Sequence, residues 1–164
     1  MPATYEPIAT TTLGSAAASI VFSSISSAYT DLRIVLTCTT STAGGQPAIR
    51  FNGDTGTNYS NTRIEGNGSS ATSNRNTNST YVFVGSGEST TIPSLIAFDI
   101  FSYAGSTNKS LLISYNSDRN GSGEVNRYVG LWRNTAAITS ITLLPNIYNF
   151  NTGTTATLYG ILRA

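Results

Sequence analysis

The sequence predicts an all-β protein, a single jelly-roll-like β-sandwich of roughly nine or ten antiparallel strands. Short runs of Val, Ile, Tyr, Phe and Thr alternate with clusters of Gly, Asn, Ser and Asp. Hardly any segment has helical period, and the runs recur at the 8–12-residue spacing of sandwiches and barrels. Residues 13–164 are therefore expected to form one β-domain, since a chain of 164 residues is long enough to bury a core.

The clearest strand is DLRIVLTCT, residues 31–39, because its apolar residues have a period of two. Leu32, Ile34, Leu36 and Cys38 share one face, and a partly polar face lies opposite. The other expected strands lie within residues 19–25, 48–53, 60–66, 80–85, 94–104, 109–117, 124–133, 138–145 and 155–163. We expect the last strand to pair beside earlier ones, so that its deletion would unfold the domain.

Two polar segments are expected to lie outside the sheets. Residues 1–12 lack a strand pattern, and Pro2 and Pro7 favour an extended backbone, which predicts an N-terminal arm. Such an arm reaches a neighbouring subunit or a shell by strand addition. Residues 66–80 form the longest stretch rich in Asn, Gly and Ser, which predicts a projecting loop.

Charge and hydropathy exclude several classes of partner. Only 10% of the residues are charged, the net charge is +1, and the arginines are spread singly, so we expect no binding to nucleic acid. No apolar stretch approaches the roughly 20 residues of a membrane-spanning helix, so no membrane partner is expected. The first residues lack a basic region and include Glu6, which argues against a secretory signal.

The chemistry-bearing residues are few. The chain has no histidine, which excludes Ser-His-Asp and Cys-His nucleophile systems and histidine metal sites. No phosphate-binding glycine motif occurs. Cys38 is the only cysteine, so no intrachain disulfide forms, and we expect it to fill an apolar strand position. The sequence therefore predicts no enzyme, no cofactor and no metal site.

Two carboxylates, Asp99 and Asp54, are the remaining candidates for catalysis or metal binding. Asp99 in LIAFDIFSY is the most suggestive catalytic acid, but a glycosidase needs a second carboxylate roughly 5–10 Å away. Nothing in the sequence marks such a partner, and the alternative is that Asp99 pairs with an arginine or caps a loop amide. Asp54 in NGDTGTN stands alone, whereas a calcium loop of the EF-hand type needs several acids, so a plain turn is expected.

Several stretches carry a resemblance to a known family. They are residues 4–36, 50–73, 129–145 and 149–164, including TYEPIATTT, VGLWRNTAAITSITLLP and NFNTGTTATLYGILRA. In these stretches the chain resembles small virion proteins encoded by tailed bacteriophages, particularly marine and cyanobacterial ones. The resemblance covers most of the chain but includes no fixed motif in residues 76–125. It implies a jelly-roll-like domain on the particle surface, made in the host cytoplasm, and no catalytic residues.

The leading functional prediction is a capsid decoration, or cement, protein that binds the assembled shell and forms a homotrimer. Its partners would be its own copies and the major capsid protein. Aromatic residues are enriched in interface cores, which suggests four contact residues: Tyr5, Tyr128, Trp132 and Tyr148. Burial of Trp132 in the domain core is the alternative for that residue.

The second prediction is a tail-fibre or receptor-binding head domain that contacts host surface glycans. In that case the loop of residues 66–80 faces the receptor, through Asn67, Ser70, Asn74, Arg75 and Asn78. A polysaccharide-degrading enzyme is disfavoured by the missing histidines and the unpaired acids. A free carbohydrate-binding module stays open as a further alternative.

Overall fold

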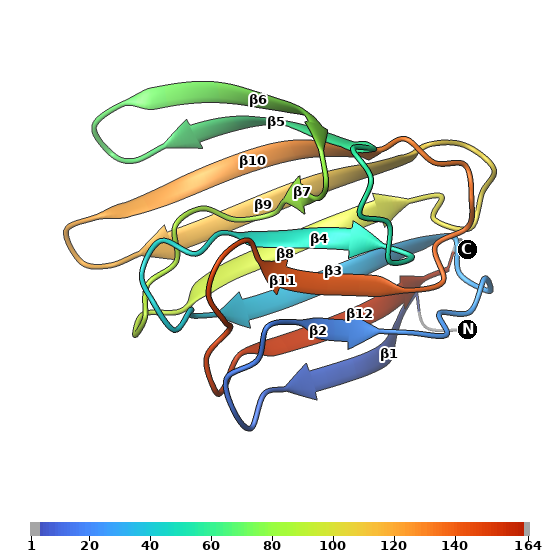
Figure 1. Ribbon diagram of the computed structural model, residues 1–164, viewed down its shortest axis with the longest axis horizontal. Helices are drawn as coiled ribbons and strands as arrows, with labels where there is room; N and C mark the ends of the chain where they lie inside the picture. Colours follow the sequence, from blue (N-terminus) through green and yellow to red (C-terminus); the bar gives the residue numbers. More distant parts are fainter. Residues whose placement is uncertain (1–3, 163–164) are drawn as a thin grey trace.

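Two antiparallel sheets pack face to face in the computed structural model, which describes residues 4–162 (Figure 1). This confirms the predicted all-β sandwich. Within the described range no helix is long and apolar enough to cross a membrane. The strands are β1 (Tyr5–Thr12), β2 (Ile20–Phe22), β3 (Asp31–Cys38), β4 (Pro47–Phe51), β5 (Tyr59–Gly66), β6 (Ala71–Ser79), β7 (Val82–Phe83), β8 (Ser94–Phe101), β9 (Lys109–Asp118), β10 (Gly123–Trp132), β11 (Ile141–Pro145) and β12 (Thr155–Ile161).

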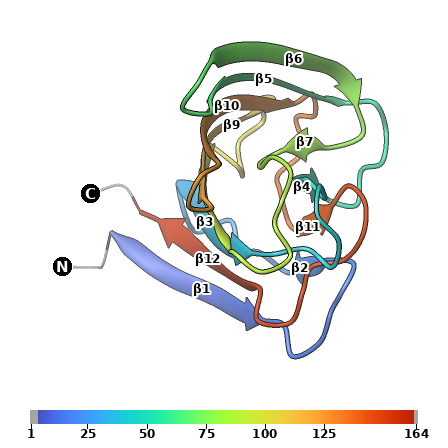
Figure 2. The same cartoon turned by 90° about the vertical axis from the view of Figure 1, so that its left-hand side faces the viewer.

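The two sheets differ in size. The larger has eight strands in the order β1-β12-β3-β8-β9-β10-β5-β6, and the smaller has four in the order β2-β11-β4-β7. Strands β8, β9 and β10 follow one another as neighbours, whereas most other connections cross between the sheets. Figure 2 shows the larger sheet curving around the smaller one. The outer face of the larger sheet is therefore left open.

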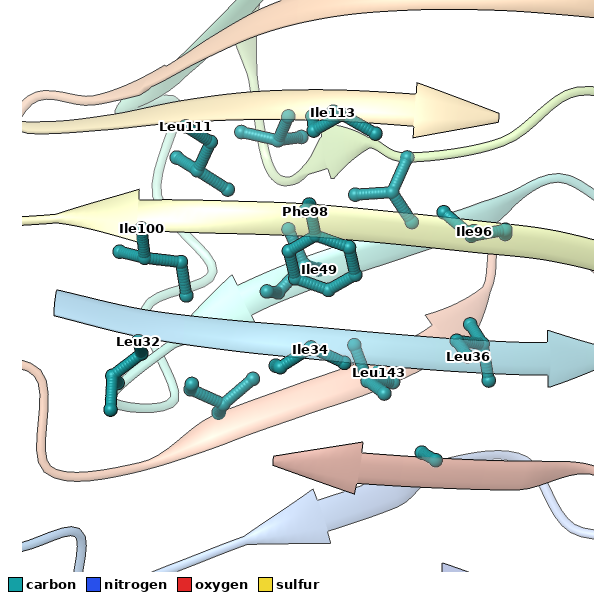
Figure 3. Packing of buried hydrophobic residues seen from close by; sticks show 14 of the residues in the cluster. Leu32, Ile34, Leu36, Ile49, Ile96, Phe98, Ile100, Leu111, Ile113 and Leu143 are labelled. Atoms are coloured by element: carbon teal, nitrogen blue, oxygen red, sulfur yellow. The ribbon is translucent and has the colours of Figure 1, made fainter. Parts of the chain in front are cut away.

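The core lies between the sheets and is built from the alternating side chains of the central strands. Leu32, Ile34 and Leu36 of β3 are fully buried, as the period of two predicted. Figure 3 shows them beside the side chains of β8 and β9, facing Ile49 of β4 and Leu143 of β11. Each such aliphatic side chain contributes about 1.5–3 kcal/mol when buried. Cys38 continues the same face and is buried, as expected.

Strand β12 is an inner member of the larger sheet. It pairs with β1 on one side and with β3 on the other, and its Ala156 and Leu158 are fully buried. Gly160 leaves room for the ring of Tyr29, which lies where a Cβ atom would stand. The expected pairing of the last strand within the sheet is confirmed.

The prediction of a separate arm over residues 1–12 is wrong for the described residues 5–12. Tyr5–Thr12 form β1, which pairs antiparallel with β12 of the same chain. Hydroxyl hydrogen bonds of 3.0 and 2.9 Å join Thr10 to Thr157 and Thr12 to Thr155. The sequence of β1 shows no apolar alternation because β1 is an edge strand with little buried surface. Residues 1–3 lie outside the described residues.

The predicted projecting loop of residues 66–80 is also wrong, because most of it is strand β6. Ala71–Ser79 pair with β5, and only a short turn joins the two strands. In that turn the Asn67 side-chain oxygen accepts hydrogen bonds from the backbone N–H groups of Ser69 and Ser70, at 3.0 and 2.8 Å. Strand β6 is largely exposed, so its residues are polar throughout and show no alternation.

Candidate functional site

Two of the four predicted contact residues belong to the core. Trp132 is 0% exposed and Tyr128 is 1% exposed, so the prediction that they lie at a subunit contact is wrong. The Trp132 ring stacks on Tyr59, with centroids 6.2 Å apart, and the Tyr128 hydroxyl donates to the Gly85 carbonyl at 3.0 Å. Both side chains face the smaller sheet because they share one face of β10. The alternative of core burial is confirmed for Trp132.

Tyr5 and Tyr148 are accessible, each with half of its side chain exposed. Tyr5 pairs with Ile161 at the end of β12, whereas Tyr148 precedes the start of that strand. The fold therefore does not bring them to one place. Their role in a contact stays a prediction.

The five predicted receptor-facing residues are divided between a turn and two faces of a strand. Asn67 and Ser70 lie in the β5–β6 turn. On β6, Asn74 lines a pocket on the inner side of the hairpin, whereas the Arg75 Nε donates to Thr62 Oγ1 at 3.1 Å. Asn78 accepts a hydrogen bond from Arg133 at 3.0 Å. They do not form one continuous loop surface.

An open recess of about 460 Å³ lies between two hairpin turns at one end of the sandwich. Figure 1 shows the β5–β6 and β9–β10 turns projecting together at that end. The recess is lined by Asn67, Gly68 and Ser69 from one turn and by Asp118, Gly121 and Glu124 from the other hairpin. Most of its lining residues are glycine, serine, asparagine or acidic residues, which offer hydrogen-bonding groups to a ligand.

The open outer face of the larger sheet carries large apolar side chains. Six of them are at least 36% exposed: Ile64, Leu95, Phe101, Leu112, Val125 and Val129. Leu112 of β9 lies directly opposite Val129 of β10, and Ile64 and Val125 lie on neighbouring positions of β5 and β10. We call this set the outer apolar face. Exposed apolar patches of this kind mark interaction sites.

Asp99 also lies on the outer side of the larger sheet and has a partner. Arg33 Nη1 is 3.0 Å from Asp99 Oδ1 and also donates to Oδ2 at 3.2 Å. The cross-strand register places the two residues directly opposite each other on β3 and β8. The predicted alternative, pairing with an arginine, is confirmed. This ion pair offsets the charge of Arg33, whereas Arg127 carries a positive charge on the same face, between Val125 and Val129 on β10.

Asp54 organises a turn, as expected. Its carboxylate accepts hydrogen bonds from the Gly56 N–H at 2.8 Å, from Asn58 Nδ2 at 3.0 Å and from Trp132 Nε1 at 2.7 Å. These donors, Trp132 first, lower the pKa of Asp54 below its ordinary value. Among the described residues no group of three or more His, Cys, Asp or Glu side chains lies close enough to hold a metal ion.

Glu88 is a buried acid that the sequence did not single out. It is 1% exposed, and neither carboxylate oxygen has a hydrogen-bond partner among the described residues. Burial raises the pKa of Glu88 to about 7. The pKa of the Cys38 thiol is raised well above its ordinary value, mainly by burial and to a smaller extent by the charge of Glu88. Glu88 stands in GSGEST, whose composition is typical of an exposed turn.

No family model and no curated protein matches this chain.

Proposed function

We propose that this chain is a bacteriophage virion structural protein on the particle surface, a capsid decoration protein that binds the assembled shell as an oligomer. The observation that supports this most directly is the outer apolar face of the eight-stranded sheet. The resemblance of residues 4–36 and 129–145 to small phage virion proteins supports the class of particle.

The outer apolar face has the composition of an interface core. Cores of protein interfaces are depleted in charge and enriched in apolar side chains. Here Leu112 and Val129 pair across β9 and β10, and the Arg33 charge is neutralised by Asp99. Arg127, which is exposed between Val125 and Val129, is of a residue type enriched at interfaces. Covering this face with protein removes apolar surface from water at about 25 cal/mol per Å².

A groove beside these residues favours a protein partner. It has a volume of about 200 Å³ and is lined by residues of β10, β5 and β6, among them Val129, Leu131, Thr62 and Arg75. An apolar side chain from a neighbouring copy or from a shell subunit fits such a groove as an anchor. When the linked copies of an oligomer bind a symmetric shell together, their combined affinity exceeds that of a single contact.

Two valine substitutions test the proposal, because the sandwich offers a matched control. Val129 is 58% exposed on the outer face of the larger sheet, and Val21 is 55% exposed on β2 of the smaller sheet. Val129→Glu is expected to weaken co-sedimentation with phage particles by roughly tenfold or more, since it buries a charge in the contact. Val21→Glu is expected to bind like the unaltered protein. Equal binding by all three proteins would contradict this role for the outer apolar face.

The second candidate function is a tail-fibre or receptor-binding head domain that contacts host surface glycans. The recess between the β5–β6 and β9–β10 turns favours it, because projecting polar turns carry recognition in many β-sandwiches. Immunogold labelling of particles separates the two functions. Labels distributed over the capsid support decoration, and labels confined to the tail support the head domain.

A further inference from the structure

We propose that the inner side of the β5–β6 hairpin binds one uncharged sugar residue, in a pocket between the hairpin and β7. This site is separate from the outer apolar face, and its existence does not depend on the decoration role. It also differs from the recess between the hairpin turns, with which it shares no lining residue.

The pocket exists because the larger sheet extends beyond the smaller one. Strand β7, the edge of the smaller sheet, has only two residues, whereas β5 and β6 have eight and nine. Where β7 meets β10 the packing is tight, since a Cβ atom on Gly130 would lie 2.7 Å from Val82. Figure 2 shows β5 and β6 extending beyond β7, the edge of the smaller sheet. Beyond the residues that β7 contacts, no strand of the smaller sheet covers their inner face.

The pocket has a volume of about 200 Å³ and is lined by Gln46, Arg63, Asn74, Asn76, Phe83 and Tyr128. This is smaller than the roughly 300–1,000 Å³ of pockets for drug-sized ligands. A single sugar ring is therefore the appropriate size of occupant, and a longer glycan would present only one residue to it.

Unpaired amide groups gather at this pocket. The side chains of Gln46, Asn74 and Asn76 make no hydrogen bond within residues 4–162. Asn61 lies directly opposite Asn76 on β5, is 3% exposed, and has no partner for either atom of its amide in the described chain. It lines the groove beside Val129 rather than this pocket, and it adjoins the pocket through its pairing with Asn76. A buried unpaired amide costs about 1–3 kcal/mol. Such a group in a native protein calls for a bound polar partner.

The chemistry of these groups selects a neutral polyol. A primary amide donates two hydrogen bonds and accepts others, which matches the hydroxyl groups of a sugar. The only cation in the pocket, Arg63, is 2.9 Å from the Glu65 carboxylate, so the site offers no free charge to a phosphate or carboxylate. Phe83 and the ring of Tyr128 supply apolar walls for the C–H groups of the sugar.

The experiment uses the full chain labelled with ¹⁵N and follows side-chain amide signals by NMR during titration. The probes are the methyl glycosides of glucose, galactose, mannose, rhamnose and N-acetylglucosamine. At least one is expected to shift the amide signals of Asn74 and Asn76, which line the pocket. If none of the five shifts them at high millimolar concentration, the proposal is wrong.

Neighbouring residues of β6 provide a matched pair of variants. Asn74→Ala removes an amide from the pocket, whereas Arg75→Ala changes the opposite face of the same strand. Asn74→Ala is expected to weaken binding of the active glycoside roughly tenfold, and Arg75→Ala to leave it unchanged. Equal losses in both variants would place the site elsewhere and overturn the proposal.

A substitution at Asn61 distinguishes an effect on sugar binding from an effect on stability. Asn61→Leu replaces an unpaired amide beside Asn76 by an apolar group of similar size, so the variant is expected to weaken sugar binding without losing thermal stability. A marked fall in thermal stability, with sugar binding retained, would assign Asn61 a structural role instead. Co-sedimentation of Asn74→Ala with particles is expected to be normal, which keeps this test distinct from that of the decoration role.

Discussion

The indole Nε1 of Trp132 donates a hydrogen bond of 2.7 Å to the Asp54 carboxylate, across 78 positions of the sequence. The bond ties the turn between β4 and β5 to the end of β10. Phe51 packs against the same indole, with ring centroids 5.4 Å apart. The Tyr59 hydroxyl also donates to the Asp54 carbonyl at 3.1 Å, and the Arg133 N–H donates to the Asn58 carbonyl at 2.8 Å, so several hydrogen bonds hold this turn to the domain.

Asp54→Asn is expected to lower the free energy of unfolding by about 1–3 kcal/mol at pH 7, because a charge-assisted hydrogen bond is replaced by a neutral one. The pKa of Asp54 is lowered in the folded state, so its contribution is present above the ordinary Asp pKa and is lost as the pH falls below it. Denaturation followed by the fluorescence of Trp132, the only tryptophan, measures this. The free energies of unfolding of the variant and the unaltered protein should converge as the pH falls toward 3. The same difference in stability at pH 7 and at pH 3 would contradict the assignment.

Glu88→Gln is expected to stabilise the protein at alkaline pH. Because the pKa of Glu88 is raised to about 7, the unfolded chain loses this proton first as the pH rises from about 4.5. The unaltered protein should therefore lose about 3 kcal/mol of stability between pH 4.5 and pH 8, and the variant should not. Urea denaturation at both pH values checks this. Equal losses of stability in the two proteins between pH 4.5 and pH 8 would refute it.

Cys38 is expected to resist thiol reagents in the folded protein. It is 1% exposed, and burial raises the pKa of its thiol, so little thiolate forms at neutral pH. Reaction with a disulfide reagent should be undetectable over minutes at pH 8 and complete in urea. Rapid labelling of the native protein would show that the strands around Cys38 open readily.

Deletion of residues 1–12 tests the assignment of β1 to the sheet. The strand pairs with β12 over its whole length, and Ile8 packs against the core. The deletion is expected to lower the melting temperature and to expose β12 as an unpaired edge, which favours association. An unchanged melting temperature would restore the interpretation of these residues as an arm.

The predictions from sequence succeeded where burial imposed alternation and failed where it did not. Strand β3 was predicted from the period of its buried residues, whereas the edge strands β1 and β6 bury little and are held by backbone hydrogen bonds. Strand β10 shows a second limit. Its Tyr128 and Trp132 face the core and its Val129 faces solvent, and both faces are apolar enough that periodicity does not distinguish them.

The candidate sites were harder to predict than the strands. Glu88 is buried because the connection between β7 and β8 folds against the sheets, and its local sequence has the composition of an exposed turn. Asn74 and Arg75 were predicted to share a receptor-facing loop, but pairing of β6 with β5 directs them to opposite sides. Such placements depend on register between distant strands, which no local pattern contains.

The most direct test of the central claim, that this chain decorates a capsid, is a cryo-EM reconstruction of intact particles that contain it. The decoration role predicts copies of this sandwich on the capsid, with Leu112 and Val129 of the outer apolar face covered by the shell or by neighbouring copies. A capsid without such density, or copies bound with that face open to solvent, would contradict it.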